Sequence, residues 1–181
     1  MPSRCVPIFL VVLAVLALEG CRQQAMLEPD QTEPSYPGFS SVLHTVDPGT
    51  VRQLTTGFYD PEAFGRWTKP KFSIMLRIPH APELFEPALL VNLYIPDDEM
   101  KRLKSVTLSA AVNGVALGSA TFATAGRQVY VRSIPAPALT GDRARVEFAL
   151  DRWLPADGPD GRELGIVVMS AGLKNTISPE F

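Results

Sequence analysis

Apolar and polar side chains alternate through the segment 71–79, KFSIMLRIP. Every second position is apolar, and these positions are Phe72, Ile74, Leu76 and Ile78. A repeat of two residues is the period of a β-strand, because successive side chains of a strand point to opposite faces of the sheet. The segment therefore predicts a strand with one buried face, and it argues against a helix at this position.

Similar segments follow along the chain, separated by clusters of Pro, Gly and Asp. The segment 88–96 is apolar on both faces apart from Asn92, which is typical of a central strand. No segment has a convincing helical period. Further strands are expected at 105–112, 115–122, 127–135, 144–150 and 163–173. Consecutive short strands with turn signals predict an all-β fold, an antiparallel β-sandwich of jelly-roll-like or immunoglobulin-like type over 55–175, followed by a tail at 176–181.

One tight turn is predicted with its geometry. Asn113 and Gly114 stand between two alternating runs. Both residue types tolerate the positive φ that a type I′ turn requires. The pair therefore predicts a two-residue β-hairpin.

Residues 1–20 have the features of a secretion signal. An apolar run at 5–18 is shorter than the roughly 20 residues that a membrane-spanning helix needs. Leu18 and Gly20 precede Cys21 as in the bacterial lipobox, although Glu19 departs from that pattern. We expect a lipoprotein signal peptide. The alternatives are an ordinary secretory signal with an unrelated cysteine and a retained membrane anchor.

Cleavage at this site would make Cys21 the first residue of the mature chain and the site of lipidation. Several acyl chains anchor a protein stably to a membrane. The protein would then lie in the bacterial cell envelope, and Arg22 favours the outer over the inner membrane. Residues 21–54 begin with a stretch rich in Gln, Glu, Pro and Ser, which predicts a flexible tether. For 42–54 an arm packed along the domain is the alternative.

The inventory of reactive residues does not favour an enzyme. His44 and His80 are the two histidines, and their places in the chain argue against a shared metal site. Phosphate loops and hydrolase motifs are absent from the sequence, and no cofactor is expected. The acids at 97–99 indicate an exposed turn rather than a cation site. A net charge of −2 without a basic stripe argues against binding to nucleic acid.

The segment 57–68, GFYDPEAFGRWT, fits neither a simple strand nor an amphipathic helix. In a helical turn, Glu62 and Arg66 would meet on one face. In an irregular loop over the mouth of the sandwich, Trp67 could instead fill the core. A half-buried arginine needs a carboxylate partner, for which Glu62 and the distant Asp160 are candidates. The expected cluster at the end of the sandwich is Glu62, Arg66, Asp160 and Arg162.

Several short motifs together resemble a β-sandwich module of bacterial glycosyltransferase and polysaccharide-related proteins. The matching positions are Gly57, Tyr59, Glu62, Arg66, Trp67, Asn113, Gly114, Asp160, Arg162, Leu164 and Gly165. They occur in the same order as in that module and cover most of 57–173. The resemblance implies a jelly-roll-like or immunoglobulin-like sandwich associated with glycans.

Two functions follow from these observations. The first is a non-catalytic saccharide-binding module, in which Tyr59 and Trp67 form an aromatic platform beside Glu62 and Arg66. The second is a structural or assembly lipoprotein, in which the same residues lock the end of the sandwich and the partner is another envelope protein. Exposure of the tryptophan ring distinguishes the two, since an open ring favours sugar and a core position favours structure.

Overall fold

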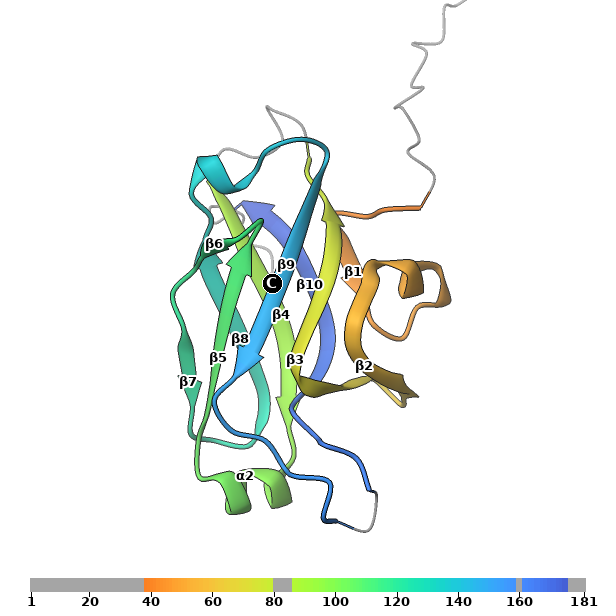
Figure 1. Cartoon of the computed structure of the whole chain (residues 1–181), viewed down its shortest axis with the longest axis vertical. Coiled ribbons are helices and arrows are strands. Elements are labelled where there is room, and N and C mark those ends of the chain that lie inside the picture. Colours follow the sequence, from red (N-terminus) through yellow and green to blue (C-terminus); the bar gives the residue numbers. More distant parts are fainter. Residues whose placement is uncertain (1–37, 80–85, 159–160, 176–181) are drawn as a thin grey trace, which may run out of the picture. The chain divides into compact units, whose positions relative to one another are not determined.

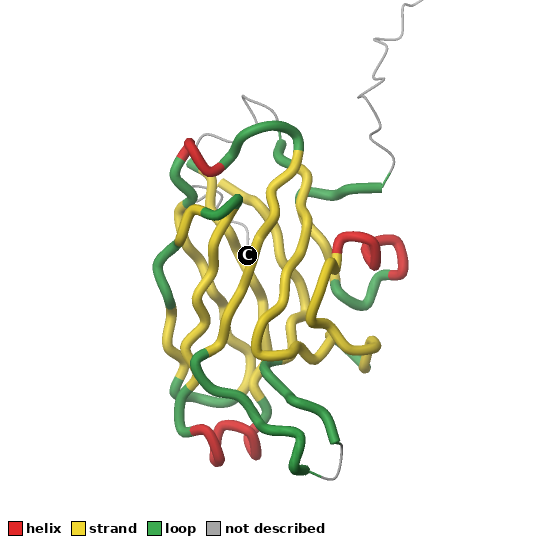
Figure 2. The backbone as a smooth tube through the Cα atoms, viewed as in Figure 1, coloured by secondary structure: helices red, strands yellow, loops and turns green. Residues whose placement is uncertain are grey.

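A computed structural model describes residues 38–79, 86–158 and 161–175. These residues belong to the unit Tyr36–Phe181. The predicted signal peptide, Cys21, His80, Asp160 and the 176–181 tail lie outside the described residues. Strands dominate the described chain, and its helices are short (Figure 2). Among the helices so described, none has the length and apolarity needed to cross a membrane. The elements are β1 (Val42–His44), η1 (Pro48–Gln53), β2 (Leu54–Glu62), β3 (Gly65–Arg77), β4 (Pro87–Ile95), α2 (Asp97–Leu103), β5 (Val106–Val112), β6 (Val115–Ala116), β7 (Ala120–Phe122), β8 (Gly126–Ser133), η2 (Ala136–Ala138), β9 (Arg143–Leu150) and β10 (Val167–Asn175).

These strands form one curled antiparallel sheet in the order β6-β5-β9-β3-β10-β4-β8, to which β1, β2 and β7 add at β10, β3 and β5. The sheet curls into two layers, with β5, β9 and β3 in front of β8, β4 and β10 (Figure 1). The predicted all-β antiparallel sandwich is therefore confirmed. The expectation of a central strand at 88–96 is confirmed too, because β4 lies between β10 and β8.

The long strand β3 joins the two layers. Near its start, Arg66 and Trp67 pair with Val168 and Val167 of β10. From Lys71 onward the same strand pairs with β9. One strand therefore belongs to both layers, which closes this side of the sandwich without a free edge.

Alternating residues of the strands fill the space between the layers. Val146, Phe148 and Leu150 of β9 face inward with Phe72 of β3, and the rings of Phe72 and Phe148 stack with centroids 4.7 Å apart. Burial of such side chains is the main favourable term in folding, at roughly 1.5–3 kcal/mol for each large apolar residue. The side chains at the alternate positions of each strand point to the outer face of the sheet.

The predicted hairpin is confirmed at the turn between β5 and β6. Asn113 and Gly114 have φ values of 46° and 83°. Val112 and Val115 pair directly across the turn, so the loop has two residues. Both turn residues are left-handed, as the sequence predicts for this pair.

The packed domain begins earlier than the predicted boundary at 55. Within the stretch predicted as a tether, β1 pairs with β10, and Leu43 belongs to the hydrophobic core. Gln53 is buried, with its amide bonded to the backbone of Ser40 and Met75. The alternative of an arm packed along the domain is therefore confirmed for 42–54. Burial of Leu43 and the pairing of β1 with β10 hold this segment on the domain, although most of its residues are polar.

The prediction of an exposed turn at 97–99 holds for Asp97 and Asp98, which are exposed, and is wrong for Glu99, which is buried. All three acids belong to a helix. They form the first turn of α2, where negative side chains are favourable near the positive end of the helix dipole. Glu99 points inward and is only 2% exposed. Neither of its carboxylate oxygens has a hydrogen-bond partner among the described residues. Burial raises the pKa of Glu99 from 4.5 to about 8, so the group is mostly protonated at neutral pH.

Candidate functional site

The segment 57–68 forms a β-hairpin, which neither of the two predicted conformations anticipates. It contains the end of β2, a turn at Ala63 and Phe64, and the start of β3. The pairing of β2 with β3 shifts register three times, which explains why no simple alternation is visible. Gly57 has a φ of 77°, and a Cβ atom there would lie 2.2 Å from the carbonyl oxygen of Lys71. Glycine is therefore required for the two strands to approach.

Arg66 is half-buried, and its partners among the described residues are backbone carbonyls, which corrects the predicted pairing with Glu62; Asp160 lies outside the described residues. Its Nε donates to the carbonyl oxygen of Thr45 at 2.7 Å, and its Nη1 donates to that of Tyr59 at 2.9 Å. Backbone carbonyls can satisfy guanidinium donors where the fold brings them close. Arg66 thereby fastens the N-terminal arm to the hairpin.

Glu62 pairs instead with Arg162, at 3.3 Å between Oε1 and Nη2. The Arg162 guanidinium lies 4.9 Å from the ring centroid of Tyr59, and the Lys69 ammonium lies 5.8 Å from the same centroid. The Tyr59 hydroxyl donates to the carbonyl oxygen of Glu163. The hairpin thus brings together four of the predicted residues, which are Tyr59, Glu62, Arg66 and Arg162. The side chains of Arg162 and Lys69 both make cation–π contacts with the Tyr59 ring.

Trp67 does not fill the core. It is half-buried, pairs in register with Val167, and is absent from the core of the described chain. The reason is alternation, since its neighbour Thr68 is the residue that points inward and is fully buried. Asp160, the remaining member of the predicted cluster, lies outside the described residues.

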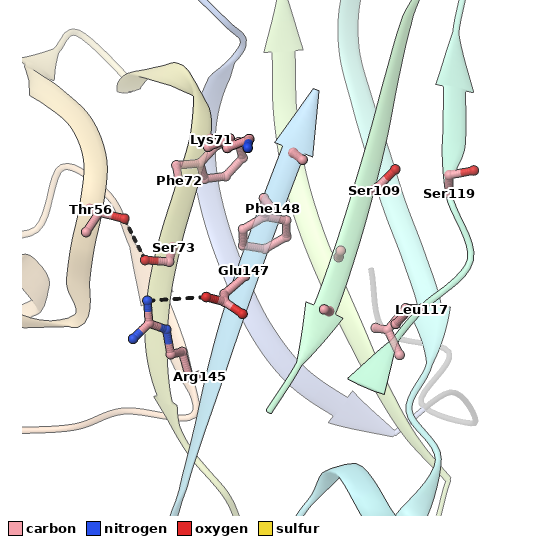
Figure 3. Close-up of a pocket in the computed structure, with 14 residues that line it drawn as sticks. Thr56, Lys71, Phe72, Ser73, Ser109, Leu117, Ser119, Arg145, Glu147 and Phe148 are labelled. Carbon is pink, nitrogen blue, oxygen red and sulfur yellow. Dashed lines mark hydrogen bonds and ion pairs between the residues drawn. The ribbon is translucent and has the colours of Figure 1, made fainter. Parts of the chain in front are cut away.

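A separate groove of about 560 Å³ lies on the outer face of the front layer. Small side chains hollow this face. Ala149 of β9 has Lys71 of β3 and Ser109 of β5 as its register partners. The next row places Glu147 between Ser73 and Ala111. Lys71 stands on one side of these short side chains and Leu117 on the other, and the groove lies between them (Figure 3).

The rim of the groove carries the polar groups. Lys71, Glu147 and Arg145 lie over β3 and β9, whereas Ser109 and Ser119 lie on the opposite side (Figure 3). Arg145 and Glu147 form an ion pair with an N–O distance of 3.2 Å, and about half of each side chain is exposed. The groove therefore combines hydroxyls, a carboxylate and two cations around an alanine-lined floor.

Among the described residues, a single carboxylate lines the groove. It is that of Glu147, and a glycosidase of the usual kind needs two facing carboxyl groups. Across the described ranges, no cluster of three or more His, Cys, Asp and Glu side chains is placed to hold a metal ion. The arrangement is suited to binding a polar ligand.

Sequence patterns do not reveal this groove, because it depends on which strands become neighbours. The one available signal is the small size of the outward residues Ser109, Ala111 and Ala149 on alternating strands. Outward positions of a strand usually carry larger polar side chains. That signal becomes informative only once β5 and β9 are known to pair.

No protein-family model matches the chain, and no curated protein matches it. Among solved structures it is similar to dimeric latent PorU from Porphyromonas gingivalis, at 10% identity and a TM-score of 0.46, over 75% of this chain and 12% of that one. It is similar to a family 35 carbohydrate-binding module from an environmental isolate, at 16% identity and a TM-score of 0.41, over 78% of this chain and 90% of that one. It is similar to carbohydrate-binding module CBM36, solved with calcium and xylotriose, at 10% identity and a TM-score of 0.41, over 74% of this chain and 98% of that one. At this identity the likeness extends to the strand arrangement alone.

Proposed function

We propose that this chain is a membrane-anchored envelope lipoprotein whose β-sandwich is a non-catalytic saccharide-binding module. The observation that carries the proposal is the groove over β3, β9 and β5. Most of its residues stand on the paired strands β3, β9 and β5, so these positions are set by the sheet before a ligand arrives. Preformed concave sites lower the entropic cost of binding.

The chemistry of the groove suits a polyhydroxylated ligand. Ser109 and Ser119 offer hydroxyls that both donate and accept hydrogen bonds, and Glu147 accepts while Lys71 donates. The rings of Phe72 and Phe148 are buried in the core. A sugar ring would therefore rest on the alanine side chains and the strand backbone, and the rim would supply its hydrogen bonds.

The hairpin residues have a structural role in this proposal. Arg162 and Lys69 both lie over the Tyr59 ring, and Glu62 pairs with Arg162, so Tyr59 and Glu62 have their contacts within the protein. These contacts join the hairpin to residues 162–163. The saccharide site accordingly lies on the front face, away from the residues that the sequence singles out.

The anchor and the location are proposed on the sequence. Lipidated Cys21 would attach the chain to the outer membrane, with the polar segment that follows as a spacer. The sandwich would then present its groove to glycans of the cell envelope.

A glycan array probed with the Tyr36–Phe181 unit tests the proposal. The variant Ala149→Trp places a bulky side chain in the middle of the groove, and Val129→Trp places the same side chain on the outer face of β8 as a matched control. We expect wild type and Val129→Trp to bind one class of glycan and Ala149→Trp to lose that binding. Equal binding by all three proteins, or none by wild type, would contradict the proposal.

The assembly role is the second candidate, and one surface favours it. Val129 and Val131 of β8 are 49% and 36% exposed on the outer face of the back layer, while Tyr130 between them is buried. Phe64, 47% exposed, packs edge-on against Tyr94 on the same layer. A photo-crosslinker at Val129 that repeatedly yields one defined envelope protein, when a crosslinker at Ala149 does not, would support this role over saccharide binding.

A further inference from the structure

We infer that the groove selects acidic saccharides, with Lys71 as the residue that recognises the negative group. This inference rests on the proposed function and adds the class of ligand. The lining residues that the structure describes carry two cations, Lys71 and Arg145, and one anion, Glu147. The groove is therefore net positive, although the whole chain has a net charge of −2.

The two cations differ in what they already contact. Arg145 is held by Glu147, so that pair is close to neutral toward a ligand. In the described part of the chain, no carboxylate forms an ion pair with Lys71. The ammonium group of Lys71 is thus the cation whose charge remains for a ligand.

The position of Lys71 directs that charge over the floor. Its register partner is Ala149, and the next residue in the row is Ser109. Neighbouring strands are about 4.8 Å apart, so Lys71 and Ser109 stand roughly 10 Å apart at the backbone. The alanine between them leaves this space open, and Figure 3 shows the lysine and the two serines on opposite sides of it.

An anionic sugar meets both sides of this row. Its carboxylate would accept a charge-assisted hydrogen bond from the Lys71 ammonium, which is stronger than a bond between neutral groups. Its hydroxyls would reach the serines, and its ring would cover Ala149. A neutral sugar would offer the Lys71 ammonium only neutral acceptors, whose hydrogen bonds are weaker, so charge distinguishes the two ligands.

The test compares polygalacturonate with its fully methyl-esterified form, because the two polymers share a backbone and differ in charge. Affinity electrophoresis of the Tyr36–Phe181 unit gives both dissociation constants. We expect wild type to bind polygalacturonate at least tenfold more tightly, and Lys71→Met to lose about that factor. Lys71→Arg should keep the preference. Arg127→Met, which removes one exposed cation from β8, is the control for non-specific attraction.

The outcomes separate this inference from the proposed function. Equal binding of both polymers by wild type, or an equal loss in Lys71→Met and Arg127→Met, overturns the role of Lys71. In that case, binding of neutral glycans by wild type and its loss in Ala149→Trp would still support the groove as the saccharide site. Binding to neither polymer also overturns the inference. Dextran sulfate against dextran shows whether a sulfate serves as well as a carboxylate, and a Lys71-dependent preference for the sulfated polymer supports recognition by charge.

Discussion

Burial of Glu99 makes one side chain contribute to the pH dependence of the domain's stability. In the unfolded chain its carboxyl group titrates near 4.5, whereas burial in the folded chain raises the pKa to about 8. Below about pH 4.5 both states hold the proton. Above it the unfolded state releases the proton while the folded state retains it, so the unfolding free energy falls as pH rises through this range.

Glu99→Gln is expected to remove this fall. A carboxyl group contributes a slope of up to about 1.4 kcal/mol per pH unit between its two pKa values, and an amide contributes none. Urea unfolding at several pH values between 5 and 8 measures the slope. Asp98→Asn, on the exposed side of the same helix, is the control and should keep the wild-type slope. The same slope in Glu99→Gln as in wild type would show that Glu99 is not responsible.

Single residues also mark where sequence reasoning reaches its limit. The sequence shows that a half-buried Arg66 needs acceptors, but those it uses are carbonyls of Thr45 and Tyr59. Backbone acceptors carry no residue signature, so they are predictable only after the path of the chain is known. The acids at 97–99 show a different limit. Their charge predicts that they are exposed, whereas Glu99 is buried.

At the scale of elements, regular strands are predictable and irregular ones are not. Alternation identifies β3 from Lys71 onward, β5 and β9, because β9 pairs with both of the others without a register shift. The hairpin of β2 and β3 is missed because three register shifts break the period of two. The order of strands across the sheet is also beyond sequence pattern, and the groove depends on that order.

A comparison of Gly57 and Gly114 distinguishes the cost of backbone strain from the cost of a steric clash in the two hairpins. Gly57 and Gly114 both have positive φ, which costs an alanine roughly 1–2 kcal/mol. A Cβ atom at Gly114 meets nothing within 4 Å, whereas one at Gly57 would lie 2.2 Å from the Lys71 carbonyl oxygen. Gly57→Ala should therefore lower the unfolding free energy by about 1–3 kcal/mol more than Gly114→Ala. Chemical denaturation of both variants measures this difference, and equal losses would refute the close approach of β2 to β3.

At the scale of the whole molecule, the proposed anchor and the groove make separate predictions. Replacement of Cys21 by serine should release the protein from membranes, because acylation needs the cysteine thiol. Fractionation of cells that express wild type and Cys21→Ser measures this. The groove should be unaffected, so the released protein should bind the same glycans. Tight membrane association of Cys21→Ser would instead indicate an uncleaved apolar anchor.

An NMR titration of ¹⁵N-labelled Tyr36–Phe181 with the tightest glycan from the array shows directly which surface of the sandwich binds the saccharide. If the saccharide lies in the groove, the amides of Lys71, Ser109, Ala111, Glu147 and Ala149 should show the largest chemical-shift changes. Amides of β8 and of the hairpin at Tyr59 and Glu62 should change little. Changes centred on Val129 or Tyr59, with those groove amides unmoved, would contradict the account.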